Sequence, residues 1–399
     1  MPKALLLENI HPDAAKSLRD HGFEVETMKG ALSEDELIDA LDGVDLVGVR
    51  SKTNVTARVL DARPTLSAIG CFCIGTNQVD LAHAGKRGIA VFNAPYSNTR
   101  SVVELVICDI ICLMRRIPAH THHIKHGLWD KSASGSHEVR GKTLGIIGYG
   151  NIGSQLSVVA EALGMRVLFY DIEEKLAMGN AHRCDTLNEL LEQSDVVTLH
   201  VDGRKSNTGF FGEDQFEHMK QDAIFINLSR GFVADLDALK KHLDSGHLSG
   251  AAVDVFPIEP KKTGDEFLTD LADEDNMILT PHIGGSTLEA QKSIGQFVSQ
   301  RLEDYWFKGS TMLSVNLPQI TLSGIKSNFR IAHLHANLPG VLARVNRVLG
   351  EDGINIAAQA LGTEGEIGYV VTDVAQRPDQ RALDQLASIE GTIRMRVIS

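Results

Sequence analysis

The feature that most constrains the fold is a glycine motif that follows a short apolar run. The run 143–147 leads into Gly148, Gly150 and Gly153, and a helical pattern continues over 154–163. Gly148 can form the tight turn, Gly150 lets the backbone approach a pyrophosphate, and Gly153 allows the helix to pack closely on the strand. Because a helix N-terminus also attracts phosphates, the motif predicts a Rossmann-type unit that binds a dinucleotide.

An acidic residue after the next predicted strand indicates which dinucleotide is bound. The strand 166–170 ends at Asp171, about 20 residues beyond the motif, where a ribose-binding acid is expected. A carboxylate accepts hydrogen bonds from both ribose hydroxyls and repels a 2′-phosphate, so we expect NAD rather than NADP. The predicted cofactor turn also includes Asn151 and Ile152.

Three polar side chains each follow a later apolar run. The runs are predicted to be strands at 223–228, 251–256 and 277–280. Arg230, Glu259 and His282 follow them in that order. Because the carboxyl ends of parallel strands open onto one crevice, we expect a cation, a carboxylate and an imidazole to meet there. Together they form a set that can reduce a carbonyl group.

Length and charge exclude several classes of protein. A chain of 399 residues predicts two or three domains, each with its own core. The net charge of -13 argues against a nucleic-acid-binding surface as the main function. The chain starts with Met1, Pro2 and Lys3 without an apolar signal region, and no run reaches the roughly 18 apolar residues of a membrane span. We therefore expect a cytoplasmic protein without a membrane segment.

The cysteines and a histidine-rich segment are predicted to be structural. We expect reduced thiols, mostly buried, because disulfides are rare in the cytosol. The cysteines are Cys71, Cys73, Cys108, Cys112 and Cys184. The histidines that follow Pro118 are His120, His122, His123 and His126. Their spacing is not that of a strict ligand set, and hydride transfer from a nicotinamide needs no metal, so no metal site is predicted.

The order of predicted elements divides the chain into three domains. Short strands at 3–8, 24–27 and 46–49, with a helix at 33–41, form an α/β unit before the glycine motif. Long helices at 101–114 and 287–307 can connect this unit to the Rossmann unit. We predict two doubly wound parallel-sheet domains: a discontinuous substrate-binding domain (1–98 and 285–316) and an NAD-binding Rossmann domain (99–284). Their closure on a substrate would exclude water.

A third, smaller domain is predicted after a polar linker at 319–328. Its elements follow the order β-α-β-β-α-β, which is that of a ferredoxin-like module. The predicted limits are 326–399. The module has little chemistry of its own.

The catalytic part resembles the D-isomer-specific 2-hydroxyacid dehydrogenase family. The resemblance is carried by the glycine motif with Asp171, Ser229-Arg230-Gly231, and the segments 254–260 and 280–285. The C-terminal module resembles an ACT domain through 335–342 and 353–356. The segment 70–80 is similar to the branch of the family that carries one C-terminal ACT domain.

The resemblance implies an oxidation of a small phosphorylated 2-hydroxy acid with NAD. His282 is then the base that takes the hydroxyl proton, Glu259 orients its imidazole, and Arg230 grips the α-carboxylate and polarises the carbonyl. Further cofactor contacts are expected at Leu228, Ser229, Asp254, Gly284 and Gly285.

Substrate contacts are expected in the first domain and beside it. Backbone amides of Ile74 and Gly75 would bind the carboxylate, and the segment Arg50, Ser51 and Lys52 would bind the distal phosphate. Asn98 and Gln291 are expected as polar contacts. The same cations could bind the second carboxylate of 2-oxoglutarate, whose reduction is known in some relatives.

The ACT resemblance implies control by L-serine in a homo-oligomer, expected to be a tetramer. His335, Asn337 and Asn355 occupy the positions that bind serine between two ACT domains in relatives, whereas Leu338 stands where arginine is frequent. Two alternatives stay open. One is a dehydrogenase of the glyoxylate or lactate type, and the other is an NAD-sensing binding protein of the family's corepressor branch.

Overall fold

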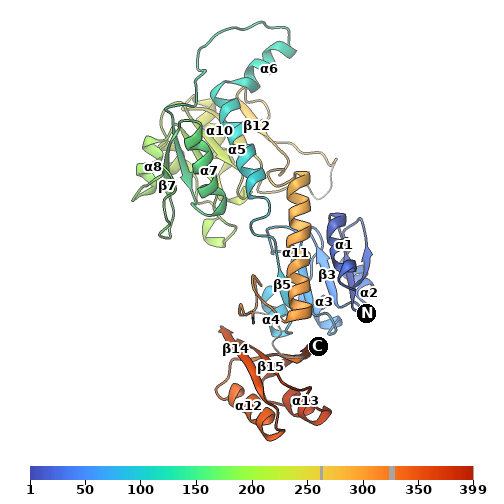
Figure 1. Ribbon diagram of the computed structural model, residues 1–399. Coiled ribbons are helices and arrows are strands. Elements are labelled where there is room, and N and C mark those ends of the chain that lie inside the picture. The colour runs from blue at the N-terminus through green and yellow to red at the C-terminus, as the bar shows by residue number, and fades with distance from the viewer. Residues whose placement is uncertain (261–263, 323–328, 399) are drawn as a thin grey trace. The chain divides into compact units, whose positions relative to one another are not determined.

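The computed structural model describes residues 1–260, 264–322 and 329–398 (Figure 1). The chain forms two compact units, the first from Met1–Ser97 with Gln291–Ser399 and the second from Asn98–Ala290. The predicted limits of the three domains stay predictions. In the described residues, no helix combines the length and the apolar content that a membrane span requires.

The first unit contains a five-stranded parallel sheet with the strand order β2-β1-β3-β4-β5. Its strands are β1 (Lys3–Leu6), β2 (Glu24–Thr27), β3 (Leu46–Val49), β4 (Ala68–Cys71) and β5 (Ala90–Phe92). The order reverses between β1 and β3, which is where ligands bind in open α/β sheets. The segments that follow these two strands carry Glu8 and Arg50.

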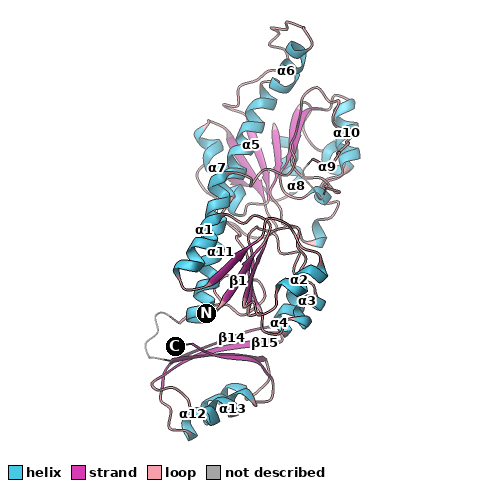
Figure 2. Cartoon of the chain, turned by 90° about the vertical axis from the view of Figure 1, so that its right-hand side faces the viewer, coloured by secondary structure: helices cyan, strands magenta, loops and turns pink. Residues whose placement is uncertain are grey.

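Helices cover both faces of this sheet (Figure 2). Side chains alternate along β1, so Leu6 joins one core and Leu5 joins the other. The Leu6 face packs against α1 (Pro12–Asp20) and α11 (Leu288–Lys308). The Leu5 face packs against α2 (Glu34–Ala40), α3 (Ala57–Ala62) and α4 (Leu81–Lys86). The doubly wound fold predicted here is confirmed.

The second unit contains a seven-stranded parallel sheet with the strand order β12-β11-β10-β9-β6-β7-β8. Its strands are β6 (Thr143–Ile147), β7 (Arg166–Tyr170), β8 (His182–Arg183), β9 (Val196–Leu199), β10 (Ala223–Asn227), β11 (Leu248–Val253) and β12 (Met277–Leu279). The order reverses between β6 and β9, so the glycine motif after β6 lies at the position that binds dinucleotides. The Rossmann prediction is confirmed.

In the described part of this unit, two helices cover one face of the sheet, and three cover the other. The first pair is α5 (Thr99–Met114) and α7 (Asn151–Ala162), and the second set is α8 (Leu187–Gln193), α9 (Glu213–Glu217) and α10 (Leu236–Asp244). After α5 the chain forms α6 (Ile117–Lys125).

Two predicted element boundaries were wrong near the site. The strand predicted at 251–256 spans Leu248–Val253, because the Asp254 carboxylate accepts turn amides and takes the chain out of the sheet. The helix predicted from Ser154 begins at Asn151, with Gly150 as its N-cap. The second and third glycines of the motif therefore belong to the helix start.

The expectation that the cysteines are mostly buried was also wrong. All five are thiols, but only Cys71 and Cys184 are buried. Cys108 is exposed because α5 turns its other face, which includes Val106 and Ile110, toward the sheet. Cys112 follows one turn later, with 3.9 Å between the two Sγ atoms.

The C-terminal module is an antiparallel sheet with the order β14-β15-β13-β16 and two helices on one face. Its elements are β13 (Phe329–Ala336), α12 (Val341–Glu351), β14 (Ile356–Glu364), β15 (Ile367–Val374), α13 (Gln380–Ala387) and β16 (Thr392–Ile398). This confirms the ferredoxin-like prediction. Of the predicted linker at 319–328, residues 323–328 lie outside the described residues, as do the predicted domain start at 326 and the last residue, 399.

The second face of this sheet joins the core around α11. Leu334 and Tyr369 pack there, and the Tyr369 hydroxyl donates to the carbonyl of Gly309 at 2.7 Å. Arg394 donates to the carbonyl of Leu66 at 2.6 Å. The module is therefore packed on the other elements of the first unit.

Candidate active site

The glycine motif has the shape that a dinucleotide requires. Gly148 has a φ of +92°, and a Cβ there would lie 2.5 Å from the carbonyl oxygen of His200. A Cβ on Gly153 would lie 2.3 Å from the carbonyl oxygen of Gly148, so only glycine lets the helix approach the strand this closely. A Cβ on Gly150 would meet no atom within 4 Å, which leaves space beside the backbone.

The helix that follows the motif offers its N-terminus to an anion. No side chain caps α7 at Gly150, so the amides of its first turn, including those of Asn151 and Ile152, lack a side-chain acceptor. Asp171 accepts from the amide of Tyr149 at 2.8 Å and from that of Glu173 at 2.9 Å. Its carboxylate is thereby held beside the glycine turn, and these residues fit NAD: amides for the pyrophosphate and an acid for the ribose.

Glu259 and His282 form a hydrogen-bonded pair. The Nδ1 atom of His282 lies 2.9 Å from Oε2 and 3.1 Å from Oε1 of Glu259. Glu259 also accepts from the backbone amide of Phe256 at 3.2 Å, which fixes the carboxylate after β11. The His282 side chain is 51% exposed. Its Nδ1 therefore donates to Glu259, and Nε2 is the atom left for a substrate.

Each member of this pair shifts the pKa of the other. The hydrogen bond and charge of Glu259 raise the pKa of His282 above its usual value, against burial and against the positive charge of Arg230. Burial alone would raise the pKa of Glu259, but the hydrogen bond and charge of His282 outweigh it and the pKa is lowered. The pair therefore favours a charged carboxylate beside an imidazole that readily accepts a proton.

The backbone around His282 is held by Asp254. His282 has a φ of +54°, and its amide donates to the carbonyl of Asp254 at 2.8 Å. The buried Asp254 carboxylate accepts from the amides of Ile283 and Gly284 at 2.8 and 2.9 Å and from the Thr280 hydroxyl at 2.6 Å. Its predicted cofactor contact stays a prediction. The arrangement shows a positioning contact that the sequence analysis missed, although an acid directly after a strand was its signal.

Arg230 lies near enough to the pair to act through its charge. Its positive charge lowers the pKa of both Glu259 and His282, although burial and the bond between those two residues have larger effects. Its guanidinium donates to the carbonyl of Ser229 at 2.7 Å. In the described part of the chain, no hydrogen bond joins Arg230 to Glu259 or His282. The guanidinium therefore keeps donors for another acceptor.

The remaining residues predicted in the second unit gather beside Gly284. A Cβ on Gly284 would lie 3.1 Å from the Asp254 carboxylate and 3.8 Å from Leu228. A Cβ on Gly285 would lie 2.3 Å from the Asn98 amide nitrogen, so the glycine permits this approach. The Asn98 Oδ1 atom is buried and has no hydrogen-bond partner among the residues that the structure describes. It is a polar atom suited to a bound ligand.

The predicted substrate segments of the first unit are tied together by two buried side chains. Glu8 accepts from the amides of Arg50, Lys52 and Thr53 at 3.2, 3.0 and 2.8 Å. The Gln78 amide donates to the carbonyl of Arg50 at 2.5 Å and to that of Gly75 at 3.3 Å.

Part of the predicted substrate segments is exposed to solvent. Ser51 and Lys52 are exposed, and Gln291 lies on α11. The carbonyl of Ile74 accepts from Asn93 at 2.5 Å. Glu8 and Gln78 were not among the predicted site residues. The position of Glu8 directly after β1, at the switch point, was a signal that could have found it.

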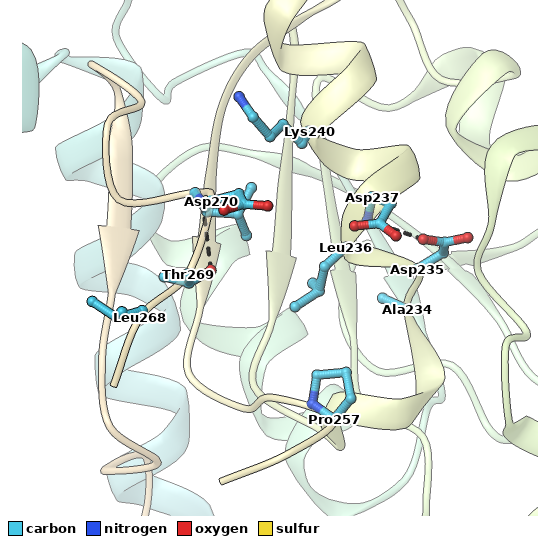
Figure 3. Close-up of a pocket in the computed structure, with 10 residues that line it drawn as sticks. Ala234, Asp235, Leu236, Asp237, Lys240, Pro257, Leu268, Thr269 and Asp270 are labelled. Carbon is cyan, nitrogen blue, oxygen red and sulfur yellow. Dashed lines mark hydrogen bonds between the residues drawn. The ribbon is translucent and has the colours of Figure 1, made fainter. Parts of the chain in front are cut away.

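A hollow of about 390 Å³ lies elsewhere on the second unit (Figure 3). Asp235, Asp237 and Asp270 surround it, with Lys240 at its edge. Arg230, Glu259 and His282 are not among its lining residues. The hollow is therefore not assigned to the chemistry of the pair.

The predicted effector residues lie at two ends of the sheet of the C-terminal module: His335 and Asn337 are at the end of β13, whereas Asn355 precedes β14 at the opposite end. His335 is buried, and its Nδ1 donates to the carbonyl of Ala336 at 2.8 Å. Its Nε2 has no hydrogen-bond partner among the described residues and is therefore an available acceptor. Asn337 donates to the carbonyl of Gly365 at 3.1 Å, whereas the side chains of Asn355 and Leu338 are exposed.

The fold and the site define a class of enzyme. Residues 107–284 match the NAD binding domain of the D-isomer specific 2-hydroxyacid dehydrogenases, and residues 331–394 match an AHAS small subunit-like ACT domain. The chain belongs to the D-isomer specific 2-hydroxyacid dehydrogenase family and uses NAD. The predictions of the family, of NAD and of the ACT domain are confirmed.

The similar proteins narrow the class. The D-3-phosphoglycerate dehydrogenase of Haemophilus influenzae is 50% identical over 397 residues, covering 99% of this chain and 97% of that protein. The D-3-phosphoglycerate dehydrogenase of Escherichia coli K12 is 49% identical over 399 residues, with the same coverage. The structure of D-lactate dehydrogenase from Aquifex aeolicus with NAD and lactic acid has a TM-score of 0.65 and 28% identity, covering 76% of this chain and 95% of that one.

Proposed function

We propose that this dehydrogenase oxidises 3-phospho-D-glycerate to 3-phosphohydroxypyruvate, the first step of L-serine biosynthesis, in the cytoplasm. The observation that carries the proposal is the bond between Glu259 and His282 beside Arg230. The substrate is proposed from the similarity to D-3-phosphoglycerate dehydrogenases, which extends through the ACT domain.

The proposed mechanism assigns the proton to His282. Neutral Nε2 takes the proton of the substrate hydroxyl, while Nδ1 stays bonded to Glu259, which stabilises the imidazolium that forms. Bound NAD supplies the acceptor for the hydride that leaves C2. Arg230 binds the α-carboxylate and stabilises the developing carbonyl oxygen with a planar pair of donors.

We assign binding of the substrate carboxylate and phosphate to residues of the first unit. The amides of Ile74 and Gly75 bind the carboxylate, and Arg50, Ser51 and Lys52 bind the phosphate. Support comes from the buried Glu8 and Gln78 contacts, which fix this backbone while leaving Ser51 and Lys52 exposed. Asn98 and Gln291 are assigned polar contacts, and Asn98 has the unpartnered oxygen described above.

A direct assay tests the proposal. Purified protein is incubated with NAD and either 3-phospho-D-glycerate, D-glycerate or D-lactate, and NADH formation is followed by absorbance. We expect turnover with the phosphorylated acid and at least about tenfold lower kcat/KM without the phosphate, because one or two charged hydrogen bonds are lost. Preference for D-lactate or D-glycerate would favour a dehydrogenase of the glyoxylate or lactate type, and no turnover with any acid would favour the NAD-sensing protein.

The same cations extend the proposal to 2-oxoglutarate. Its second carboxylate can take the place of the phosphate at Arg50 and Lys52, so we expect slow NADH-dependent reduction to 2-hydroxyglutarate. Loss of that activity in Arg50→Ala, together with loss of the phosphorylated substrate, would support one shared anion site.

L-serine is proposed as an effector of the ACT module in a homo-oligomer, expected to be a tetramer. Support comes from the buried Nε2 of His335, which has no partner among the described residues and can accept from a serine hydroxyl or ammonium group. We expect serine to lower activity in the wild type and to have no effect in His335→Ala, with a coupling free energy of about 1–3 kcal/mol. A wild type whose activity and melting temperature ignore serine would leave the module as an assembly element.

A further inference from the structure

A second cluster of polar side chains lies on α6 and the loop that follows it, and Figure 1 shows this helix beyond the end of α5. His120 and His123 are three residues apart, so they share one face of the helix. The helix ends at Lys125, Gly127 follows with a φ of +78°, and the amide of Leu128 donates back to the carbonyl of His123 at 2.9 Å. This C-terminal turn reverses the chain and returns Asp130 to the helix.

The returning carboxylate completes a set of three ligand atoms. One ring nitrogen from each of His120 and His123 and one oxygen of Asp130 lie within 4.8 Å of one another. The Nδ1 of His123 lies 3.8 Å from Oδ2 of Asp130. The other oxygen, Oδ1, accepts from the amide of Ser132 at 2.8 Å, which fixes the carboxylate. Nδ1 of His123 is buried and has no hydrogen-bond partner in the described residues.

The donor set selects the kind of ion. Two imidazole nitrogens and one carboxylate oxygen are ligands that Zn²⁺ prefers, and three protein ligands leave a fourth position for water. Ca²⁺ and Mg²⁺ prefer oxygen ligands alone. The His123 and Asp130 side chains are 30% and 34% exposed, so an ion and its water can reach them.

We propose that His120, His123 and Asp130 bind one divalent ion of the Zn²⁺ class, a function independent of the proposed dehydrogenase chemistry. In a tetrahedral site with usual bond lengths the ligand atoms lie roughly 3.4 Å apart. Rotation of the two imidazole rings brings the three atoms to this spacing, because the amide of Ser132 holds the Asp130 carboxylate. The ion then ties the loop at Asp130 to α6.

The histidine spacing did not predict this site, because the third ligand lies outside the histidine-rich segment. Asp130 became a candidate only through the turn at Gly127, which is a property of the fold. Usual metal-binding sequence motifs do not include an acidic residue that follows a histidine-rich helix by a few residues. Such a residue was nevertheless the signal in the sequence.

Calorimetric titration of the full-length protein with Zn²⁺, after removal of metals, tests the proposal. We expect one ion per chain, and at least about tenfold weaker binding in His123→Ala and in Asp130→Asn, since even an outer partner of a metal ligand is worth that much. His122→Ala is the matched control, because it removes a histidine from the same helix that stacks on His126 at 4.1 Å and is outside the set. Circular dichroism checks that each variant folds.

A second readout locates the ion. Trp129 adjoins Asp130 and is 78% exposed, whereas the second tryptophan, Trp306, belongs to α11 of the first unit. Co²⁺ should therefore quench the fluorescence of the wild type and of His122→Ala, but not that of Trp129→Phe or His123→Ala. No binding at micromolar Zn²⁺, or equal losses in His122→Ala and His123→Ala, would overturn the site. Full affinity in Asp130→Asn would do the same.

Discussion

At the scale of single residues, the proton chemistry depends on one imidazole nitrogen. Glu259 occupies Nδ1 of His282, so only Nε2 can exchange a proton with the substrate. We predict that His282→Ala lowers kcat by about 10²–10⁴-fold, as loss of a general acid-base does. NADH binding, measured by fluorescence titration, should persist because the glycine turn and Asp171 are untouched. Near-normal turnover would remove His282 from the mechanism.

The pair also predicts how activity depends on pH. Oxidation needs neutral His282, so kcat/KM should rise with pH through the pKa of His282, which Glu259 raises above the usual 6.5. In Glu259→Gln the charge that favours imidazolium is lost, so this pKa falls and the rising limb moves to lower pH, with a lower plateau. The reverse reaction needs the protonated form and should fall with pH instead. An unmoved limb would show that a different group titrates.

At the scale of elements, the segment after β3 is predicted to decide substrate choice. We predict that Arg50→Ala lowers kcat/KM for the phosphorylated acid far more than for a short 2-oxo acid, because a phosphate loses a charged partner and a methyl group does not. Steady-state kinetics with both substrates measure the ratio. Arg63→Ala is a suitable control, since Arg63 pairs with Asp42 in the same unit but is outside the segment. Equal losses for both substrates would contradict a phosphate contact.

The conformation of residues 50–53 depends on the Glu8 carboxylate, to which no substrate contact is assigned. Glu8 is buried and accepts three amides of residues 50–53. In Glu8→Gln, an NH₂ group replaces one carboxylate oxygen and places a donor opposite a backbone amide that is also a donor. We therefore predict that the KM for the phosphorylated acid rises by about 5–50-fold, equivalent to about 1–2.3 kcal/mol. NAD affinity should stay unchanged, because the glycine turn belongs to the other unit. A change in kcat alone would argue against a positioning role.

Strand patterns and glycine spacing predicted much of this arrangement, and hydrogen bonds between distant residues account for what was missed. The apolar run that forms β10 and the glycine motif are local signals, so Arg230 and Asp171 could be found from the sequence. The bonds from Glu8 to Arg50 and from Asp254 to Gly284 join segments far apart in sequence. Periodicity carries no signal for such bonds, and the return of Asp130 to α6 was missed for the same reason.

At the scale of the whole molecule, a buried ion pair inside the C-terminal module includes an arginine that also bonds to α11 of the first unit. Arg330 on β13 and Asp373 on β15 are each 1% exposed and bond at 2.6 and 2.9 Å. Arg330 also donates to the carbonyl of Lys308, the last residue of α11, at 2.7 Å. Removing one partner of such a pair leaves a buried charge without compensation, which costs far more than the pair itself contributes.

We therefore predict that Arg330→Ala destabilises the first unit by about 3–5 kcal/mol. Urea unfolding in a Trp129→Phe background, where Trp306 on α11 is the one remaining tryptophan, measures this unit by itself. Arg344→Ala, which breaks the exposed pair with Glu390, is the control and should change stability by at most about 1 kcal/mol. Replacing both buried partners, as in Arg330→Met with Asp373→Leu, should restore most of the loss, because no charge is then left unpaired. Equal stability of Arg330→Ala and Arg344→Ala would mean that water or movement compensates Asp373, and that the module is not held by this pair.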